Sequence, residues 1–216
     1  MADFLSGPNG SKEFFKKIVK LNLRKRIGLY STHQFSCGIK AGKWLYGPNS
    51  SFEVMNNAID AEKFKYDSAI AAKYKIELSL QDNIVIGHIG RFSTQKNHIF
   101  LFDILCELLK LEPSIKLLLV GDGPLRKQLE AYADKIGVRE HIIFLGVRTD
   151  IENLCMAMDY FAFPSLYEGL PVTLIEAQCS GLKIIASDEI TREVKLTNNI
   201  YFCLLYTSPS PRDRQK

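Results

Sequence analysis

The chain has 216 residues, of which 46% are apolar and 24% are charged, enough for one hydrophobic core but short for two complete domains. No run of 18 apolar residues occurs, and the first residues lack the basic and apolar segments of a secretory signal. We therefore expect a cytoplasmic protein that does not span a membrane.

The net charge of +4 is unevenly distributed. Lys12–Arg26 holds seven basic residues and one acid, and Arg212–Lys216 holds three and one, so the remainder of the chain carries −4. The central part of the chain is therefore mildly acidic. This argues against a nucleic-acid groove, which needs a basic stripe on the surface of the folded domain.

The cysteines and histidines form no recognisable ligand pattern. The five cysteines are odd in number and widely spaced, and the four histidines lie apart. Neither a disulfide framework nor a zinc site is indicated, and we expect no metal.

The sequence of the N-terminal part predicts few helices or strands. Lys12–Ile27 has the pattern of a basic amphipathic helix, and Phe52–Asn57 that of a strand leading into a turn. We interpret residues 1–50 as the remnant of a preceding N-terminal domain and residues 51–82 as the crossing into the next one.

Residues 83–203 alternate short β-rich runs with helical patterns. The predicted strands are Ile84–Ile89, Lys116–Val120, Ile142–Leu145, Tyr160–Phe163, Lys183–Ala186 and Ile200–Phe202. The predicted helices are Asn97–Leu111, Leu125–Ile136, Ile151–Ala157 and Pro171–Ser180. This alternation predicts an α/β fold, a Rossmann-like parallel sheet with helices on both faces.

The last residues, 204–216, differ in composition from the rest. Tyr206–Lys216 has three basic residues, two prolines and no apolar period, so we expect a disordered and non-native tail. An authentic charged tail is the alternative.

Ligands of an open parallel sheet bind outside the carboxyl ends of its strands, where helix N-termini point free N–H groups. The turn after the first predicted strand, Gly90–Asn97, places Arg91 and Lys96 at a helix start. Two cations there oppose the helix dipole unless an anion lies between them. A phosphate-bearing ligand is one interpretation, and a solvated basic loop is the other.

A second candidate turn is Pro164–Glu176, again between a strand and a helix. Pro171 suits the first helical position, and Gly169 allows close approach of the backbone to a ligand, with the N–H of Leu170 also free. Glu176 lies in an otherwise apolar helix. It either faces inward and binds sugar or ribose hydroxyls, or it faces solvent.

Two further motifs have a structural interpretation. Gly121-Asp-Gly123 lacks the third glycine of a dinucleotide fingerprint and predicts a tight turn before a helix that starts at Pro124. Its place at the ligand edge of the sheet leaves contact with a ligand as the alternative. Asp150-Ile-Glu152 resembles a metal-binding Asp-x-Asp, but Asp150 as a helix cap is a sufficient explanation.

Taken in order, these motifs resemble the C-terminal domain of retaining family 4 glycosyltransferases with the GT-B fold, of the exopolysaccharide-biosynthesis type. The resemblance covers roughly residues 36–202. Its motifs are Gly90-Arg91, Lys96-Asn97-His98, Leu119–Gly123, Phe144–Gly146, Asp159–Ser165 and the pair Glu168 and Glu176, eight residues apart.

The resemblance implies a nucleotide-diphosphate sugar as donor and a polysaccharide or lipid-linked glycan as acceptor. It places Arg91 and Lys96 on the diphosphate, Glu168 toward the donor sugar and Glu176 on the ribose. Gly90 and Gly169–Pro171 would approach the ligand with their backbone. Arg91, Lys96 and Glu168 are thus the predicted catalytic residues, and no metal or other cofactor is implied.

Transfer with retention of configuration is the expected reaction of the intact enzyme. The resemblance makes residues 1–50 the remnant of an N-terminal acceptor domain, whose glycine-rich loop and any catalytic histidine are absent from this chain. A nucleotide-binding module without transfer activity is therefore the alternative. The basic helix at residues 12–27 either contacts the inner face of the membrane or is simply solvated.

Overall fold

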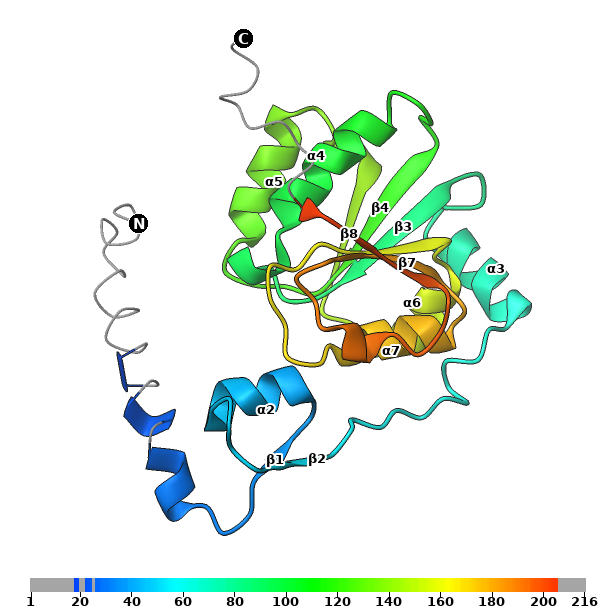
Figure 1. Ribbon diagram of the computed structural model, residues 1–216. Coiled ribbons are helices and arrows are strands. Elements are labelled where there is room, and N and C mark those ends of the chain that lie inside the picture. Colours follow the sequence, from blue (N-terminus) through cyan, green and yellow to red (C-terminus); the bar gives the residue numbers. More distant parts are fainter. Residues whose placement is uncertain (1–17, 20–21, 25, 206–216) are drawn as a thin grey trace. The chain divides into compact units, whose positions relative to one another are not determined.

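The computed structural model describes residues 18–19, 22–24 and 26–205, and the chain divides into two compact units, Met1–Asn57 and Ala58–Lys216 (Figure 1). The predicted tail beyond residue 205 lies outside the described residues. No helix in the described part of the chain is both long and apolar enough to cross a membrane.

In the first unit, two short parallel strands flank one helix. Strands β1 (Phe35–Ser36) and β2 (Glu53–Val54) pair in parallel, and α2 (Ile39–Tyr46) connects them. The strand predicted from residue 52 to 57 is therefore shorter than expected. The predicted N-terminal helix lies largely outside the described residues, although residues 18–19, 22–24 and 26–30 are helical.

The second unit contains a parallel sheet of six strands in the order β5-β4-β3-β6-β7-β8. All five strand pairs are parallel, as predicted. The strands are β3 (Ile84–Ile89), β4 (Ile115–Val120), β5 (Ile142–Gly146), β6 (Tyr160–Phe163), β7 (Lys183–Ser187) and β8 (Ile200–Cys203). Each predicted strand is confirmed to within one residue at either end.

Helices cover both faces of this sheet, which confirms the predicted α/β class (Figure 1). Helices α4 and α5 pack with one core cluster, and α6 and α7 pack with the other, on the opposite face. The helices are α3 (Ser68–Glu77), α4 (His98–Leu108), α5 (Arg126–Lys135), α6 (Ile151–Met156) and α7 (Val172–Cys179). Four of these helices, α4 to α7, were predicted from the sequence. The predicted ranges extend beyond the observed ends by at most three residues.

Helix α3 was not predicted from the sequence. Half of its apolar residues are alanines, and two lysines interrupt the pattern, so no continuous apolar stripe forms. Asp67 caps the N-terminus of the helix, since its carboxylate accepts hydrogen bonds from the N–H groups of Ala69 and Ile70. The helix packs against α6. Capping and tertiary contact therefore stabilise a helix that the hydrophobic pattern did not reveal.

The glycines of Gly121-Asp-Gly123 bring two loops into backbone contact. A Cβ at Gly121, where φ is +131°, would lie 2.1 Å from the carbonyl oxygen of Gly90. A Cβ at Gly123 would lie 2.4 Å from the carbonyl oxygen of Phe92. The turn after β4 therefore buttresses the turn after β3, and helix α5 starts at Arg126 rather than at Pro124.

Gly121→Ala is expected to destabilise the fold by about 3 kcal/mol or more, because a positive φ and a steric clash act together. Gly137→Ala is the matched control, since φ is +75° there but nothing lies within 4 Å of the added Cβ. We expect that variant to lose only about 1 kcal/mol. Urea unfolding measures both, and equal losses would show that the contact with Gly90 is unimportant.

Candidate functional site at the carboxyl edge of the sheet

The strand order reverses between β3 and β6, which are hydrogen-bonded neighbours in the middle of the sheet. From β3 the chain proceeds outward through β4 and β5, and from β6 it proceeds through β7 and β8 on the other side. Loops that follow β3 and β6 leave the same edge, where open α/β sheets bind their ligands. Both predicted ligand segments, Gly90–Asn97 and Pro164–Glu176, start at this reversal. The second divides into a turn, residues 164–171, and the first part of α7.

Two hydrogen bonds tie these turns together. The amide of Gln95 donates from Nε2 to the carbonyl oxygen of Tyr167 over 2.8 Å, and the N–H of Leu166 donates to the carbonyl oxygen of Gln95 over 2.9 Å. Segments 71 residues apart in the sequence are thus held side by side. The side chains that each turn presents consequently share one neighbourhood.

Lys96 and Glu168 meet between the two turns. The Lys96 ammonium lies 2.8 Å from Glu168 Oε1, with the side chains 14% and 13% exposed, and 4.4 Å from the centre of the Phe163 ring. The position of a Cβ at Gly90 would be 2.9 Å from Lys96 Cε, so the lysine stem lies across that glycine. The structure therefore brings Gly90, Lys96 and Glu168 together.

This ion pair corrects the electrostatic argument made from the sequence. The sequence pattern called for an anion near Lys96 and offered phosphate as one source. In the structure the Glu168 carboxylate is already an anion beside Lys96. A bound diphosphate would share or replace this partner, since an ammonium group has three N–H donors.

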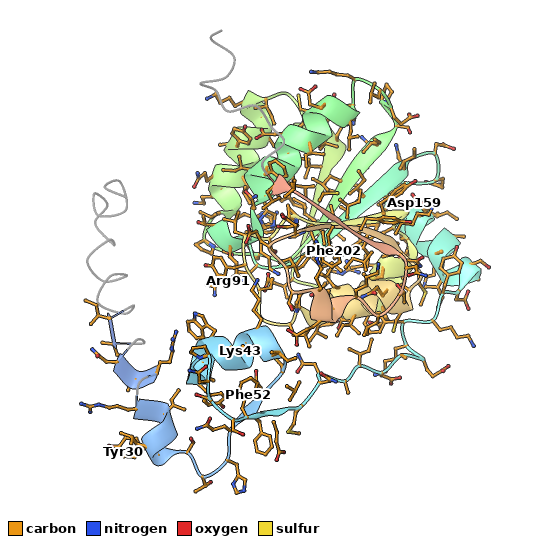
Figure 2. All side chains as sticks on the ribbon, in the orientation of Figure 1. Tyr30, Lys43, Phe52, Arg91, Asp159 and Phe202 are labelled. Atoms are coloured by element: carbon orange, nitrogen blue, oxygen red, sulfur yellow. The ribbon has the colours of Figure 1, made fainter. Side chains whose placement is uncertain are left out.

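Arg91 follows β3 directly, and its side chain is exposed and points away from the sheet (Figure 2). It forms no ion pair with any residue that the structure describes. Its guanidinium is thus free to bind an external anion, the property that a diphosphate site at this edge needs.

The start of α7 presents several backbone N–H groups. Pro171 has extended backbone angles and caps the helix, which begins at Val172, so Pro171 lies one position earlier than predicted. In the described structure the N–H groups of Gly169, Leu170, Val172 and Thr173 make no hydrogen bond. No side chain caps this end either, so the positive end of α7 is open to an anionic ligand.

Glu176 is half-buried in α7 and interacts electrostatically with Glu152 and Cys155 of α6, so it does not face solvent alone. Burial, and after it the neighbouring Glu152 carboxylate, raise the pKa of Glu176. Burial also raises the pKa of the Cys155 thiol to about 12, with Glu176 as the next cause. Glu176 lies in α7, the helix that follows the 164–171 turn, but no contact in the described structure joins it to the Lys96–Glu168 pair.

His88 and His98 are both buried. Neither was assigned a role from the sequence, since they form no ligand pattern, although His98 belongs to one of the motifs of the resemblance. The His88 Nδ1 lies 2.9 Å from the carbonyl oxygen of Ala162, and the two imidazole rings meet edge to face with centroids 4.7 Å apart. Burial lowers the pKa of His88 well below its usual value and lowers the pKa of His98 to about 4. Both rings are therefore neutral at physiological pH.

The prediction that Asp150 caps α6 through its side chain is wrong. Asp150 occupies the cap position, but its carboxylate makes no hydrogen bond to the N–H groups of the helix. It accepts instead from Arg148 Nε and from the hydroxyl of Tyr74, each over 2.8 Å. The residue thus connects α3 to the loop before α6. The guanidinium of Arg148 and the hydroxyl of Tyr74 hold the pKa of Asp150 well below its usual value.

Asp150→Asn is expected to lower stability at neutral pH by about 0.5–1 kcal/mol, because the pair is partly exposed. A carboxyl with a depressed pKa stabilises the fold above its unfolded pKa of about 3.9, and this contribution is lost as the pH falls below that value. The difference in Tm between wild type and variant should therefore shrink below about pH 4. A difference independent of pH would contradict this assignment.

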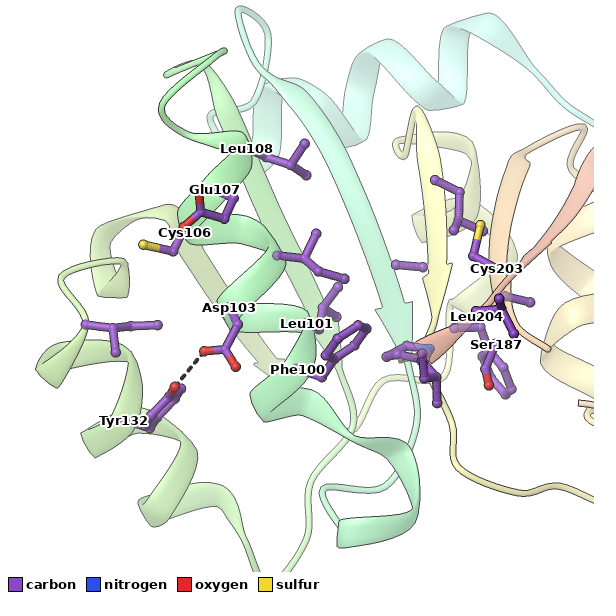
Figure 3. A pocket seen from close by; sticks show the side chains of 18 of the residues that line it. Phe100, Leu101, Asp103, Cys106, Glu107, Leu108, Tyr132, Ser187, Cys203 and Leu204 are labelled. Carbon is purple, nitrogen blue, oxygen red and sulfur yellow. Dashed lines mark hydrogen bonds between the residues drawn. The ribbon is translucent and has the colours of Figure 1, made fainter. Parts of the chain in front are cut away.

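Two hollows lie elsewhere on the second unit. The larger, of about 1010 Å³, lies beside α4 and the ends of β6, β7 and β8, with Tyr132 donating a hydrogen bond to Asp103 at its side (Figure 3). The other, of about 700 Å³, lies near α3 and the start of β6. None of the predicted site residues lines either of these two hollows.

The sheet order and its two helical layers match the fold of the C-terminal domain of GT-B glycosyltransferases. The structure of HepE from Anabaena in complex with UDP and glucose superposes with a TM-score of 0.78 at 22% identity, over 94% of this chain and 56% of that one. WaaG, involved in lipopolysaccharide biosynthesis, superposes with a TM-score of 0.69 at 21% identity, over 79% and 48%. These likenesses show the fold.

Residues 71–199 match the family of glycosyl transferases group 1, and the chain belongs to that family. It is 37% identical to the putative glycosyltransferase EpsF of Bacillus subtilis over 179 residues, which are 81% of this chain and 47% of the relative. It is 34% identical over 152 residues to an α-1,3-galactosyltransferase of Escherichia coli, named for UDP-Gal and GlcNAc-diphosphoundecaprenol, over 68% and 39%. The chain thus spans about half the length of these relatives or less.

Proposed function

We propose that this chain is the donor-binding part of a retaining family 4 glycosyltransferase, which transfers a sugar from a nucleotide diphosphate to a polysaccharide or lipid-linked acceptor. The observation that carries the proposal is the meeting of two ligand turns at the strand-order reversal, with Lys96 and Glu168 in contact between them. The names of the relatives support a UDP-sugar donor and an acceptor of this kind.

The proposed chemistry follows from the charges at this edge. Departure of the nucleotide diphosphate builds negative charge, which Arg91, Lys96 and the open N-terminus of α7 would stabilise. Glu168 would bind the donor sugar, and Glu176 would accept hydrogen bonds from the ribose hydroxyls. Because cations of the protein serve the diphosphate, the proposal requires no metal. The enzyme would bind its acceptor at the cytoplasmic face of the membrane.

A titration with UDP and GDP tests donor binding, once in excess EDTA and once with Mg²⁺. We expect micromolar to millimolar binding of at least one nucleotide, unchanged by EDTA. If neither nucleotide binds, the proposal fails. A sugar-nucleotide transfer assay on a longer chain with an acceptor domain then separates an enzyme from a nucleotide-binding module without transfer activity.

Arg91→Ala is expected to weaken nucleotide diphosphate binding roughly 10- to 150-fold, the value of one charge-assisted hydrogen bond of about 1.5–3 kcal/mol. Because the side chain is exposed, the Tm should remain that of the wild type. Calorimetric titration measures the affinity, and Lys63→Ala, which removes another exposed cation, is the control. Equal affinity of the Arg91 variant and the wild type would remove Arg91 from the site.

A further inference from the structure

Two buried imidazoles lie behind the 90–97 turn with most of their nitrogens unused. His88 in β3 is fully buried, and His98 at the start of α4 is 2% exposed. In the part of the chain that the structure describes, His88 Nε2 and both ring nitrogens of His98 have no hydrogen-bond partner. Buried polar atoms are nearly always paired, so these three need an explanation.

The hydrogen bond on the other side of His88 defines its tautomer. Nδ1 lies 2.9 Å from the carbonyl oxygen of Ala162, and a carbonyl oxygen can only accept. Nδ1 therefore carries the hydrogen, and Nε2 of the neutral ring carries a lone pair. The buried, unpaired atom of His88 is thus an acceptor that lacks a donor.

A donor is close by. The position of a Cβ at Gly90 would lie 3.3 Å from His88 Nε2 and 2.9 Å from Lys96 Cε, so the imidazole and the lysine stem border the same space. The ammonium of Lys96 contacts Glu168 Oε1 at 2.8 Å and the face of the Phe163 ring at 4.4 Å. The charge of Lys96 also contributes to the lowered pKa of both histidines. An acceptor without a donor thus adjoins an ammonium group.

We propose that His88 is a positioning residue for Lys96, whose ammonium donates a hydrogen bond to His88 Nε2 when it moves from Glu168 toward the diphosphate of the donor. His88 would then hold the ammonium at the sheet edge while Glu168 is released toward the sugar. The His98 ring, packed edge to face on His88 and on Phe92, would fix the plane of the His88 ring. The inference rests on the function proposed above.

Two substitutions separate the nitrogens of His88. His88→Asn keeps an N–H donor near the position of Nδ1, for the carbonyl oxygen of Ala162, and has no atom at the position of Nε2. His88→Gln places its amide near the position of Nε2 and loses the hydrogen bond to Ala162. Titrations with UDP and GDP should show about a tenfold loss of affinity for the asparagine variant, as for one lost hydrogen bond, and binding near the wild-type value for the glutamine variant. The Tm should be higher for the asparagine variant than for the glutamine variant, because only the asparagine variant keeps the hydrogen bond to Ala162.

A double-mutant cycle tests whether His88 acts through Lys96. In the Lys96→Ala background, His88→Asn should cause no further loss of UDP affinity. The same fractional loss in both backgrounds, or wild-type affinity of the asparagine variant, would overturn the role of His88 while leaving the proposed function intact. Absence of nucleotide binding by the wild type overturns the proposed function and this inference with it.

A measurement on the unchanged protein guards against variants that fail to fold. In histidine-labelled protein, the ¹⁵N resonance of the unprotonated His88 Nε2 should shift on addition of UDP as it accepts a hydrogen bond. It should not shift with UDP in Lys96→Ala. A wild-type resonance that UDP leaves unchanged at saturation contradicts the inference.

Discussion

Lys96→Ala is expected to weaken UDP or GDP binding by about 100-fold or more. Removal of the ammonium loses charge-assisted hydrogen bonds to the diphosphate, each worth about 1.5–3 kcal/mol. It also leaves the Glu168 carboxylate, 13% exposed and 2.8 Å from the ammonium in the wild type, without its partner and next to an anionic ligand. Both effects act in the same direction, so the loss should exceed that of Arg91→Ala.

The second effect can be measured separately. Lys96→Ala combined with Glu168→Gln removes the unpaired carboxylate, so nucleotide diphosphate affinity should partly recover relative to Lys96→Ala alone. The Tm should recover as well, because an unpaired buried charge is costly. Calorimetric titration and thermal unfolding measure the two quantities. If Lys96→Ala binds UDP or GDP as tightly as the wild type, Lys96 does not bind the diphosphate.

Glu176→Gln is expected to weaken nucleotide binding roughly 10- to 150-fold and to raise stability at neutral pH. A neutral amide loses the charged acceptor proposed for the ribose hydroxyls, which accounts for the affinity. Burial and the Glu152 carboxylate raise the pKa of Glu176, so ionisation of this group costs stability in the folded protein.

The sign of the pH effect follows from the direction of that shift. A carboxyl whose pKa is raised on folding stabilises the fold below its unfolded pKa of about 4.3, and this contribution is lost as the pH rises through the folded pKa. The Tm of Glu176→Gln should therefore exceed that of the wild type at pH 7, and the difference should vanish near pH 4.

Glu152→Gln is the matched control for Glu176. It relieves the same repulsion, so it should also raise the Tm at pH 7, yet it should leave UDP and GDP affinity near the wild-type value. If Glu176→Gln raises the Tm and weakens nucleotide binding, whereas Glu152→Gln only raises the Tm, the Glu176 carboxylate serves binding at the expense of stability. Wild-type affinity of Glu176→Gln would exclude the ribose role.

The sequence alone determined the architecture of the second unit. Six short apolar runs alternate with amphipathic segments, which predicts a parallel sheet covered on both faces, since each run must be buried on both sides. The positions of the ligand turns followed too, because the carboxyl end of each strand is readable from chain direction. Helix ends were less well predicted, since capping depends on local backbone angles, as at Pro171.

Only the tertiary structure decided which side chains meet. The Lys96–Glu168 pair joins residues 72 positions apart, and Asp150 binds Tyr74 of a helix that no hydrophobic stripe revealed. The buried state of His88 and His98 likewise depends on the aromatic rings of β6 and the 90–97 turn around them. Periodicity reports which residues face a core, whereas pairing of polar groups depends on strand order and loop contacts. For this reason the sheet was predictable from the sequence and the partners at its edge were not.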